Sequence, residues 1–387
     1  MKRCKKWCRK AADSLSISFL ILYKSVLLPV YFFRSHSFGV SLRLFYALQM
    51  KLYYKKIELP FEYPFTISGG RTKTHQPSLL VALQLGSLIG YGEAPAIQYY
   101  DVTVDSMIEA LEQKRAFVEK FALTEPERYW HYLHHLFPSN PFLVAALDMA
   151  AWDLFGKMEQ QLVYRLWNVT WDNTPLTDYT IGIDTPENMV NKMLAKPWPI
   201  YKIKLGVPND IELVALLRKH TNAVFRIDAN AGWTLEEALI KIPQLQQLGV
   251  QFIEQPLAKE DWGGMKVLYQ TSSLPLIADE SCVLETDVEK CLHHFHGINI
   301  KLTKCSGLTP AKRMIAQARK LGLQVMMGSM NESTLGSAAI AQFLPLLDYV
   351  DMDGPLLLKE DIATGLNFEF GKVDILGKSG LGIQLKQ

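Results

Sequence analysis

From residue 178 onward, short apolar runs alternate with stretches of helical periodicity, and most of the runs end in a polar residue. The residues that end successive runs, from Lys202 to Asp351, are 22 to 26 positions apart, which leaves room for one helix between two strands. Eight strands with helix-sized spacers predict an α/β fold, a modified (β/α)7β TIM-type barrel over 178–354, rather than an open sheet. The predicted strands are Tyr179–Ile183, Tyr201–Leu205, Val224–Asp228, Phe252–Glu254, Leu276–Asp279, Ile298–Lys301, Gln324–Met327 and Tyr349–Asp351.

The pattern of residues 50–177 is different and predicts an α+β capping domain. Three alternating stretches favour a small antiparallel sheet, with a long turn around 68–73 between the first two strands, and three helical stretches follow. Residues 355–387 are too few for another strand and helix, so we expect them to pack back against the cap. The predicted strands are 51–62, 78–85 and 90–94, and the predicted helices are 105–121, 125–135 and 141–166.

Residues 1–49 combine a basic head with an apolar run from Ser14 to Phe33 that is interrupted by Lys24. This order is similar to a signal sequence or a membrane anchor, but Lys24 is costly in hydrocarbon and no small-residue cleavage site follows. We favour the interpretation that Met50 is the true start and that the preceding segment is an over-extended reading frame or a disordered leader. Membrane contact is therefore expected only if this leader is native.

Composition and charge exclude several classes of protein. Apolar residues make up 49% of the 387-residue chain, which is ordinary for a globular protein. The five cysteines favour a reducing compartment, so we expect a cytoplasmic protein without a disulfide framework. Residues 1–49 carry a net charge of +8, which leaves −6 for the body of the chain. A body without a basic tract predicts no nucleic-acid binding.

The predicted strand around residues 200–206 carries two lysines on one face, because side chains alternate with period two. Lys202 and Lys204 point the same way, while Ile203 points the other way. Two nearby ammonium groups repel, which favours the neutral form of at least one of them, and a partly neutral lysine is a usable general base. A solvated strand edge is the alternative that this stretch alone leaves open.

Three consecutive predicted strands end in carboxylates, at Asp228, Glu254 and Asp279, and strands that end in lysine flank them. Catalytic groups of such barrels lie at the carboxyl ends of the strands. Three converging carboxylates need a cation, and ligation by oxygen alone selects a hard ion such as Mg²⁺. Lys204 and Lys301 would lie on opposite sides of a bound carbon, so one removes a proton and the other returns one with inversion. A metal-free network of ion pairs is the alternative.

These motifs resemble the enolase superfamily, in the subgroup of the muconate-lactonising enzymes. The motifs are Lys-x-Lys at 202–204, Asp-x-Asn at 228–230, Glu-Gln-Pro at 254–256, Ala-Asp-Glu-Ser at 278–281, Lys-Leu-x-Lys at 301–304 and Asp-x-Asp at 351–353. Within the subgroup, residues 327–333 and 351–355 look like the dipeptide epimerases. The resemblance covers about residues 50–387. It implies Mg²⁺ on the three carboxylates, Lys204 and Lys301 as acid/base catalysts, and Lys202 as the residue that holds the substrate carboxylate and lowers the pKa of Lys204.

The resemblance further implies an isomerase that inverts the C-terminal residue of a dipeptide through an enediolate. Asp351 and Asp353 would bind the dipeptide ammonium group. A cation near Arg71 in the turn of the cap would suit Ala-Glu from peptidoglycan turnover, whereas a turn that faces solvent would leave a pocket for Ala-Ala or Ala-hydrophobic dipeptides. Thr177, Ser329 and Met330 are further expected substrate contacts, and a homo-oligomer is expected.

Two other functions stay open at this point. An o-succinylbenzoate synthase or an N-acylamino-acid racemase would keep the fold, but their substrates lack the free ammonium group that Asp351 and Asp353 suit. A non-catalytic barrel scaffold leaves the joint presence of two lysines and three carboxylates unexplained.

Overall fold

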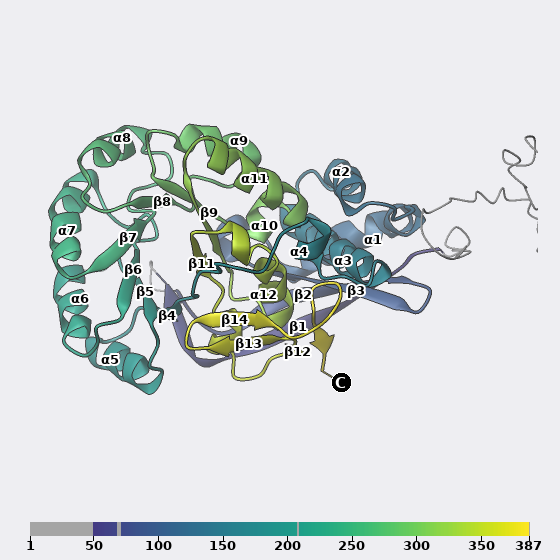
Figure 1. The fold of residues 1–387 in the computed structure, drawn as a ribbon, viewed down its shortest axis with the longest axis horizontal. Coiled ribbons are helices and arrows are strands. Elements are labelled where there is room, and N and C mark those ends of the chain that lie inside the picture. The colour runs from purple at the N-terminus through teal and green to yellow at the C-terminus, as the bar shows by residue number, and fades with distance from the viewer. Residues whose placement is uncertain (1–48, 68–70, 207–208, 387) are drawn as a thin grey trace, which may run out of the picture. The chain divides into compact units, whose positions relative to one another are not determined.

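The computed structural model describes residues 49–67, 71–206 and 209–386, of which 50–386 belong to one compact unit. The expectations for the leader fall on residues that lie outside this description. Eight parallel strands form the central sheet (Figure 1), which confirms the predicted α/β barrel. In chain order they are β4 (Tyr179–Ile181), β5 (Ile200–Lys204), β6 (Val224–Asp228), β7 (Val250–Glu254), β8 (Leu276–Ala278), β9 (Gly297–Ile300), β10 (Gln324–Gly328) and β11 (Tyr349–Asp351).

Each barrel strand pairs with the next strand in the sequence, from β4 to β11. The first and last strands meet through a parallel bridge between Thr177 and Val350, which nearly closes the barrel. Above this bridge the side chain of Asp353 accepts a hydrogen bond from Thr180 N at 2.6 Å. The seam between β4 and β11 is therefore held by this bridge and by side-chain hydrogen bonds, one of them to a buried carboxylate.

Helices cover the outside of the barrel, and α5 to α8 form an outer row beside β4 to β8 (Figure 1). Local sequence signals fix where they begin. At the start of α7, for example, Thr234 and Glu237 form a capping box, each side chain accepting a hydrogen bond from the other's backbone N–H. The helices are α5 (Pro186–Ala195), α6 (Asp210–Arg218), α7 (Leu235–Gln247), α8 (Trp262–Thr271), α9 (Glu285–Val288), α10 (Leu302–Cys305), α11 (Leu308–Lys320), α12 (Thr334–Ala341) and α13 (Gly354–Leu357), with short 3₁₀ turns η2 (Glu289–Cys291) and η3 (Leu344–Leu346).

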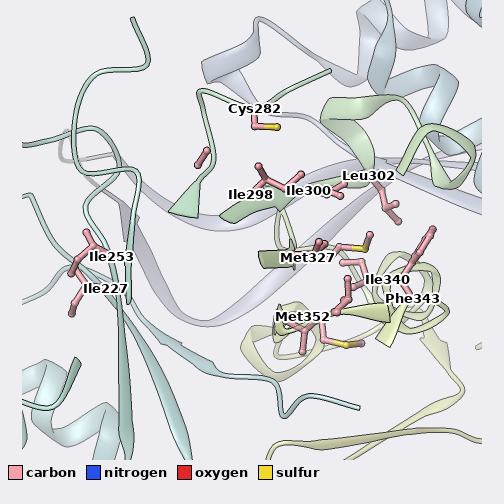
Figure 2. Close-up of a cluster of buried hydrophobic side chains, with 14 of the residues drawn as sticks. Ile227, Ile253, Cys282, Ile298, Ile300, Leu302, Met327, Ile340, Phe343 and Met352 are labelled. Carbon is pink, nitrogen blue, oxygen red and sulfur yellow. The ribbon is translucent and has the colours of Figure 1, made fainter. Parts of the chain in front are cut away.

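The main hydrophobic core lies between the strands and these helices. Ile227 of β6 and Ile253 of β7 belong to it, as do Ile298 and Ile300 of β9 (Figure 2). The neighbouring position Phe252 belongs to a separate small cluster with Ile277 and Met326, as the period-two alternation of a strand requires. The barrel interior is thus packed below the level of the predicted site.

The cap consists of an antiparallel sheet in the order β1–β2–β3 and four helices. Strand β2 begins at Arg71, so residues 71–77 extend the strand rather than the predicted turn. The predicted helix over 141–166 is two helices, because the chain turns at Gln160, whose φ of 56° is left-handed. The elements are β1 (Lys51–Ile67), β2 (Arg71–Leu85), β3 (Leu88–Pro95), η1 (Gln98–Tyr100), α1 (Val104–Lys120), α2 (Pro126–Leu136), α3 (Pro141–Met158) and α4 (Val163–Leu166).

The chain after α13 returns to the cap through backbone and side-chain hydrogen bonds. Lys359 N donates to Pro60 O at 2.8 Å, and Leu381 N donates to Asp153 Oδ1 at 2.8 Å. Its strands are β12 (Ala363–Thr364), β13 (Leu366–Glu369), β14 (Lys372–Ile375) and β15 (Gln384–Leu385). No helix in the described ranges is long and apolar enough to cross a membrane.

Candidate active site

The predicted catalytic residues lie at the carboxyl ends of the barrel strands. Lys204, Asp228 and Glu254 are in register across β5, β6 and β7. Asp279 directly follows β8, and Lys301 directly follows β9. Three strands separate β5 from β9 in either direction around the barrel, so Lys204 and Lys301 approach the row of carboxylates from opposite ends.

Each carboxylate of the row contacts at least one lysine. Lys204 Nζ lies 2.6 Å from Asp228 Oδ2, and Lys301 Nζ lies 2.7 Å from Asp279 Oδ2. Lys202 is central, with its Nζ 2.8 Å from Glu254, 3.2 Å from Asp228 and 2.8 Å from Asp351. Charges that are buried this deeply are stable only when they are paired in this way.

The pairing determines the ionisation of the site. Burial opposes ionisation of Asp228, but Lys204 and Lys202 outweigh it and lower its pKa to about 2. Burial likewise opposes the charged form of Lys202 and Lys301, yet their carboxylate neighbours hold the pKa of both lysines above the ordinary range. For Lys202, the attraction of Asp351, Glu254 and Asp228 therefore outweighs the repulsion that was predicted between Lys202 and Lys204. Neutralising the carboxylates with a cation would remove the cause of this rise.

The chemistry of the donor set fits Mg²⁺. Asp228, Glu254 and Asp279 are at most 2% exposed and offer oxygen atoms only. Several oxygens in this region are buried without a hydrogen bond, among them Asn230 Oδ1 and Glu254 Oε2. Glu254 Oε2 lies within ion-pair distance of Lys202 but is not aligned for a hydrogen bond. In the described part of the chain no three acidic, histidine or cysteine side chains are arranged to hold a metal as they stand. In this structure the lysines that contact these carboxylates balance their negative charge.

Several residues that support the carboxylates were missed by sequence reasoning. Gln255 Oε1 accepts hydrogen bonds from Asp279 N at 3.0 Å and Ser281 N at 3.1 Å, and Asn299 Nδ2 donates to Glu254 Oε1 at 2.8 Å. The buried Lys304 Nζ donates to Asp279 Oδ1 and to Asp279 O. The motifs Glu-Gln-Pro and Lys-Leu-x-Lys contain two of these residues, so their positions were visible although their roles were not.

The two aspartates of the Asp-x-Asp motif are buried near the β4–β11 seam. Asp351 Oδ2 accepts a hydrogen bond from Lys202 Nζ, whereas its Oδ1 is buried without a partner. Burial, with repulsion from Asp351 and Asp178, raises the pKa of Asp353 well above its usual range. A buried oxygen without a donor and a second carboxylate beside it suit a cationic group of a ligand.

The remaining predicted contacts lie in different places. Ser329 and Met330 follow β10 at the carboxyl end of the barrel, and Met330 N donates to Glu332 Oε2 at 2.6 Å. Thr177 is fully buried at the seam, where its hydroxyl accepts a hydrogen bond from Met352 N at 3.1 Å. These are the contacts of a residue that closes the barrel. Arg71 begins β2, but its side chain lies outside the described residues.

Comparison with known proteins agrees with this geometry. Residues 187–387 match the family described as enolase C-terminal domain-like. The L-Ala-D/L-amino acid epimerase of Flavobacterium johnsoniae is 50% identical over 336 residues, which cover 87% of this chain and 100% of that protein. The substrate-liganded L-Ala-D/L-Glu epimerase of Bacillus subtilis superposes with a TM-score of 0.82 at 30% identity and covers 87% of this chain and 98% of its own. The dipeptide epimerase of Cytophaga hutchinsonii, complexed with Mg and D-Ala-L-Val, gives 0.82 at 25% identity, with 88% and 96% covered.

The chain therefore belongs to the enolase superfamily. Within that superfamily it is a member of the dipeptide epimerase group, whose enzymes are isomerases that act on amino acid derivatives. The predicted resemblance, the isomerase class and the Mg²⁺ cofactor are confirmed by these comparisons.

Proposed function

We propose that this protein is a Mg²⁺-dependent epimerase that inverts the C-terminal residue of a dipeptide by two-base proton transfer. The observation that carries the proposal is the placement of Lys204 and Lys301 at opposite ends of one row of buried carboxylates. Inversion needs a proton to leave one face of the α-carbon and another to reach the opposite face, and two amines on opposite sides provide this.

Asp228, Glu254 and Asp279 would hold Mg²⁺. When bound, this ion supplies positive charge that stabilises the substrate carboxylate as the neighbouring carbon loses its proton. The amine of Lys204 or Lys301 takes that proton, and the other lysine, as an ammonium group, donates a proton to the opposite face. Lys202, which touches three carboxylates, holds its charge and orients the acidic row.

The substrate's free ammonium group would bind at Asp351 and Asp353. A cation at this position would give Asp351 Oδ1 a hydrogen-bond donor. It would also offset the repulsion between Asp353 and its neighbouring carboxylates. An N-acylated amino acid lacks this cation, so the pair supports a dipeptide over an N-acylamino acid. The similar protein of Flavobacterium johnsoniae is named an L-Ala-D/L-amino acid epimerase, which supports a substrate with alanine first and a variable second residue. Ala-Glu, Ala-Ala and Ala-hydrophobic dipeptides all fit this description.

The test is a library of Ala-initiated dipeptides incubated with Mg²⁺ in D₂O and analysed by mass spectrometry and chiral chromatography. We expect one deuterium to enter the C-terminal residue together with inversion of that residue only. N-acetyl and N-succinyl amino acids serve as the matched controls, and deuterium uptake by these compounds but not by dipeptides would contradict the proposal.

A further inference from the structure

Lys304 is a buried lysine next to the site for which the proposed reaction has no use. Its side chain is fully buried and lies on α10, one helical turn after Lys301. Its Nζ donates to Asp279 Oδ1 at 2.5 Å, to Asp279 O at 2.6 Å, to Cys282 O at 3.2 Å and, at the longer distance of 3.5 Å, to Asn299 O. An ammonium group has three donors, so these acceptors satisfy it without a substrate.

Asp279 consequently lies between two ammonium groups that come from one turn of helix. Lys301 binds Oδ2 and Lys304 binds Oδ1. The two lysines differ in what else holds them. Among the described residues, Lys301 Nζ contacts Asp279 Oδ2 alone and its side chain is 9% exposed, whereas Lys304 also donates to three backbone carbonyls. Lys301 therefore has fewer contacts to break than Lys304 if its side chain turns toward a substrate.

We propose that Lys304 is a positioning residue that fixes the third metal-binding carboxylate. By holding Oδ1 and the backbone from Asp279 to Cys282, it leaves Oδ2 directed at the metal position when Lys301 turns away. Partners of metal ligands commonly act in this way, and their loss typically weakens metal binding tenfold to a hundredfold. The inference depends on the metal site of the proposed function but not on the substrate.

An alternative role for Lys304 predicts the opposite result. If the residue only adds positive charge near the site, its removal makes the site more negative and strengthens Mg²⁺ binding, because like charges repel. If it orients Asp279, its removal weakens Mg²⁺ binding. The direction of the change in Mg²⁺ affinity therefore separates the two roles.

The experiment is calorimetric titration of the full chain with Mg²⁺ in the absence of dipeptide. We expect K304M to bind Mg²⁺ at least tenfold more weakly than the wild type. In K301M, which removes the other ammonium group on Asp279, we expect Mg²⁺ affinity within threefold of the wild type or tighter. Unchanged or tighter Mg²⁺ binding by K304M would overturn the proposal, as would an equal loss in K301M.

A matched control comes from the cap, where Lys157 donates to Asp153 Oδ2 at 2.6 Å and to Ile89 O at 2.8 Å. K157M also breaks a lysine–aspartate pair with a buried aspartate, so it reports the effect of lost stability alone. We expect K157M to keep the Mg²⁺ affinity of the wild type, and a loss equal to that of K304M would overturn the proposal.

If K304M does not fold, K304Q replaces it, since glutamine retains N–H donors without the charge. At least a threefold loss of Mg²⁺ affinity is expected for K304Q, and wild-type affinity would overturn the proposal. The titration contains no substrate, so its outcome can be interpreted even if the protein does not epimerise dipeptides. Mg²⁺ binding without epimerisation would refute the proposed function, but the proposed role of Lys304 would still be tested.

Discussion

At the residue scale, identical side chains acquire different roles from their neighbours. Lys202 and Lys204 lie on the same face of β5, two positions apart, yet Lys202 is 1% exposed among three carboxylates whereas Lys204 is 9% exposed and contacts one. Each carboxylate partner favours the charged form of a lysine, and the carboxylates around Lys202 hold its pKa well above the usual range. This difference in partners supports the proposed assignment of proton transfer to Lys204 rather than to Lys202.

The two-base assignment predicts that K204A and K301A each abolish inversion. Because a positioned acid or base contributes about 10²- to 10⁴-fold, the kcat for epimerisation should fall by at least about 10²-fold in each variant. Chiral chromatography of a preferred dipeptide over time measures this fall. The control is K312M, which removes an exposed lysine on α11 that pairs with Glu127, and it should retain full activity. Inversion at the wild-type rate by K204A or K301A would rule out the assignment.

At the scale of elements, the loop after β10 is anchored to the cap by one buried carboxylate. Glu93 at the end of β3 accepts hydrogen bonds from Ser333 N at 3.2 and 3.3 Å and from the Ser333 hydroxyl. Burial raises the pKa of Glu93 to about 7, partly offset by Ser333 and reinforced by Asp361. The anchor ties the segment that contains Ser329 and Met330 to the cap.

A raised pKa makes this anchor pH-dependent, and the sign follows from linkage. Glu93 holds its proton more tightly in the folded than in the unfolded protein, so its contribution is full below pH 4.5 and is lost as the pH rises through about 7. The loss amounts to about 3 kcal/mol, since each pKa unit is worth about 1.4 kcal/mol. Glutamine mimics the protonated form, so E93Q should lose less stability between pH 5 and pH 8 than the wild type does.

Urea unfolding of E93Q and the wild type at both pH values measures this difference. The free energy of unfolding of E93Q minus that of the wild type should increase with pH. Titrating groups that are common to both proteins contribute equally to the two values, so their effects cancel in this difference. E93D is a useful companion, because it retains the titrating carboxyl while shortening its reach. A difference for E93Q that stays constant between pH 5 and pH 8 would show that Glu93 has no raised pKa.

At the scale of the whole molecule, the site depends on segments from every part of the described chain. The cap strand β3 anchors the β10 loop, helix α3 receives the C-terminal segment through Asp153, and barrel strands supply the charged row. The site region combines Asp228, Glu254, Asp279 and Asp351 with Lys202, Lys204, Lys301 and Lys304, all at most 9% exposed. A cation that relieves repulsion among the carboxylates should therefore stabilise the fold as a unit.

Mg²⁺ is predicted to raise the melting temperature, since a ligand that binds only the folded state stabilises it by mass action. At a Mg²⁺ concentration one hundredfold above the Kd, the expected gain is about 2.7 kcal/mol in the free energy of unfolding. Differential scanning calorimetry with Mg²⁺, and after its removal by EDTA, measures this gain. D279N should lose the Mg²⁺-dependent part of the shift, and equal melting temperatures of the wild type with and without Mg²⁺ would contradict the prediction.

The local sequence determined the barrel and the chemical content of its site. Strands and helices follow from the period of apolar positions, so all eight barrel strands were predicted, although the start of β2 and the break after α3 were not. Asp228, Glu254 and Asp279 were found because parallel strands align their carboxyl ends, which converts regular spacing along the chain into proximity in space. No contact between distant segments was needed for either inference.

Only the tertiary structure decided which partners these charges take. The bond from Lys304 to Asp279 joins residues 25 positions apart, and the bond from Ser333 to Glu93 joins residues 240 apart. Such pairs leave no periodic pattern in the sequence, because their geometry depends on how whole elements pack. Burial raises the free energy of any unpaired charge. Each buried carboxylate therefore stays ionised only where a lysine or another donor faces it.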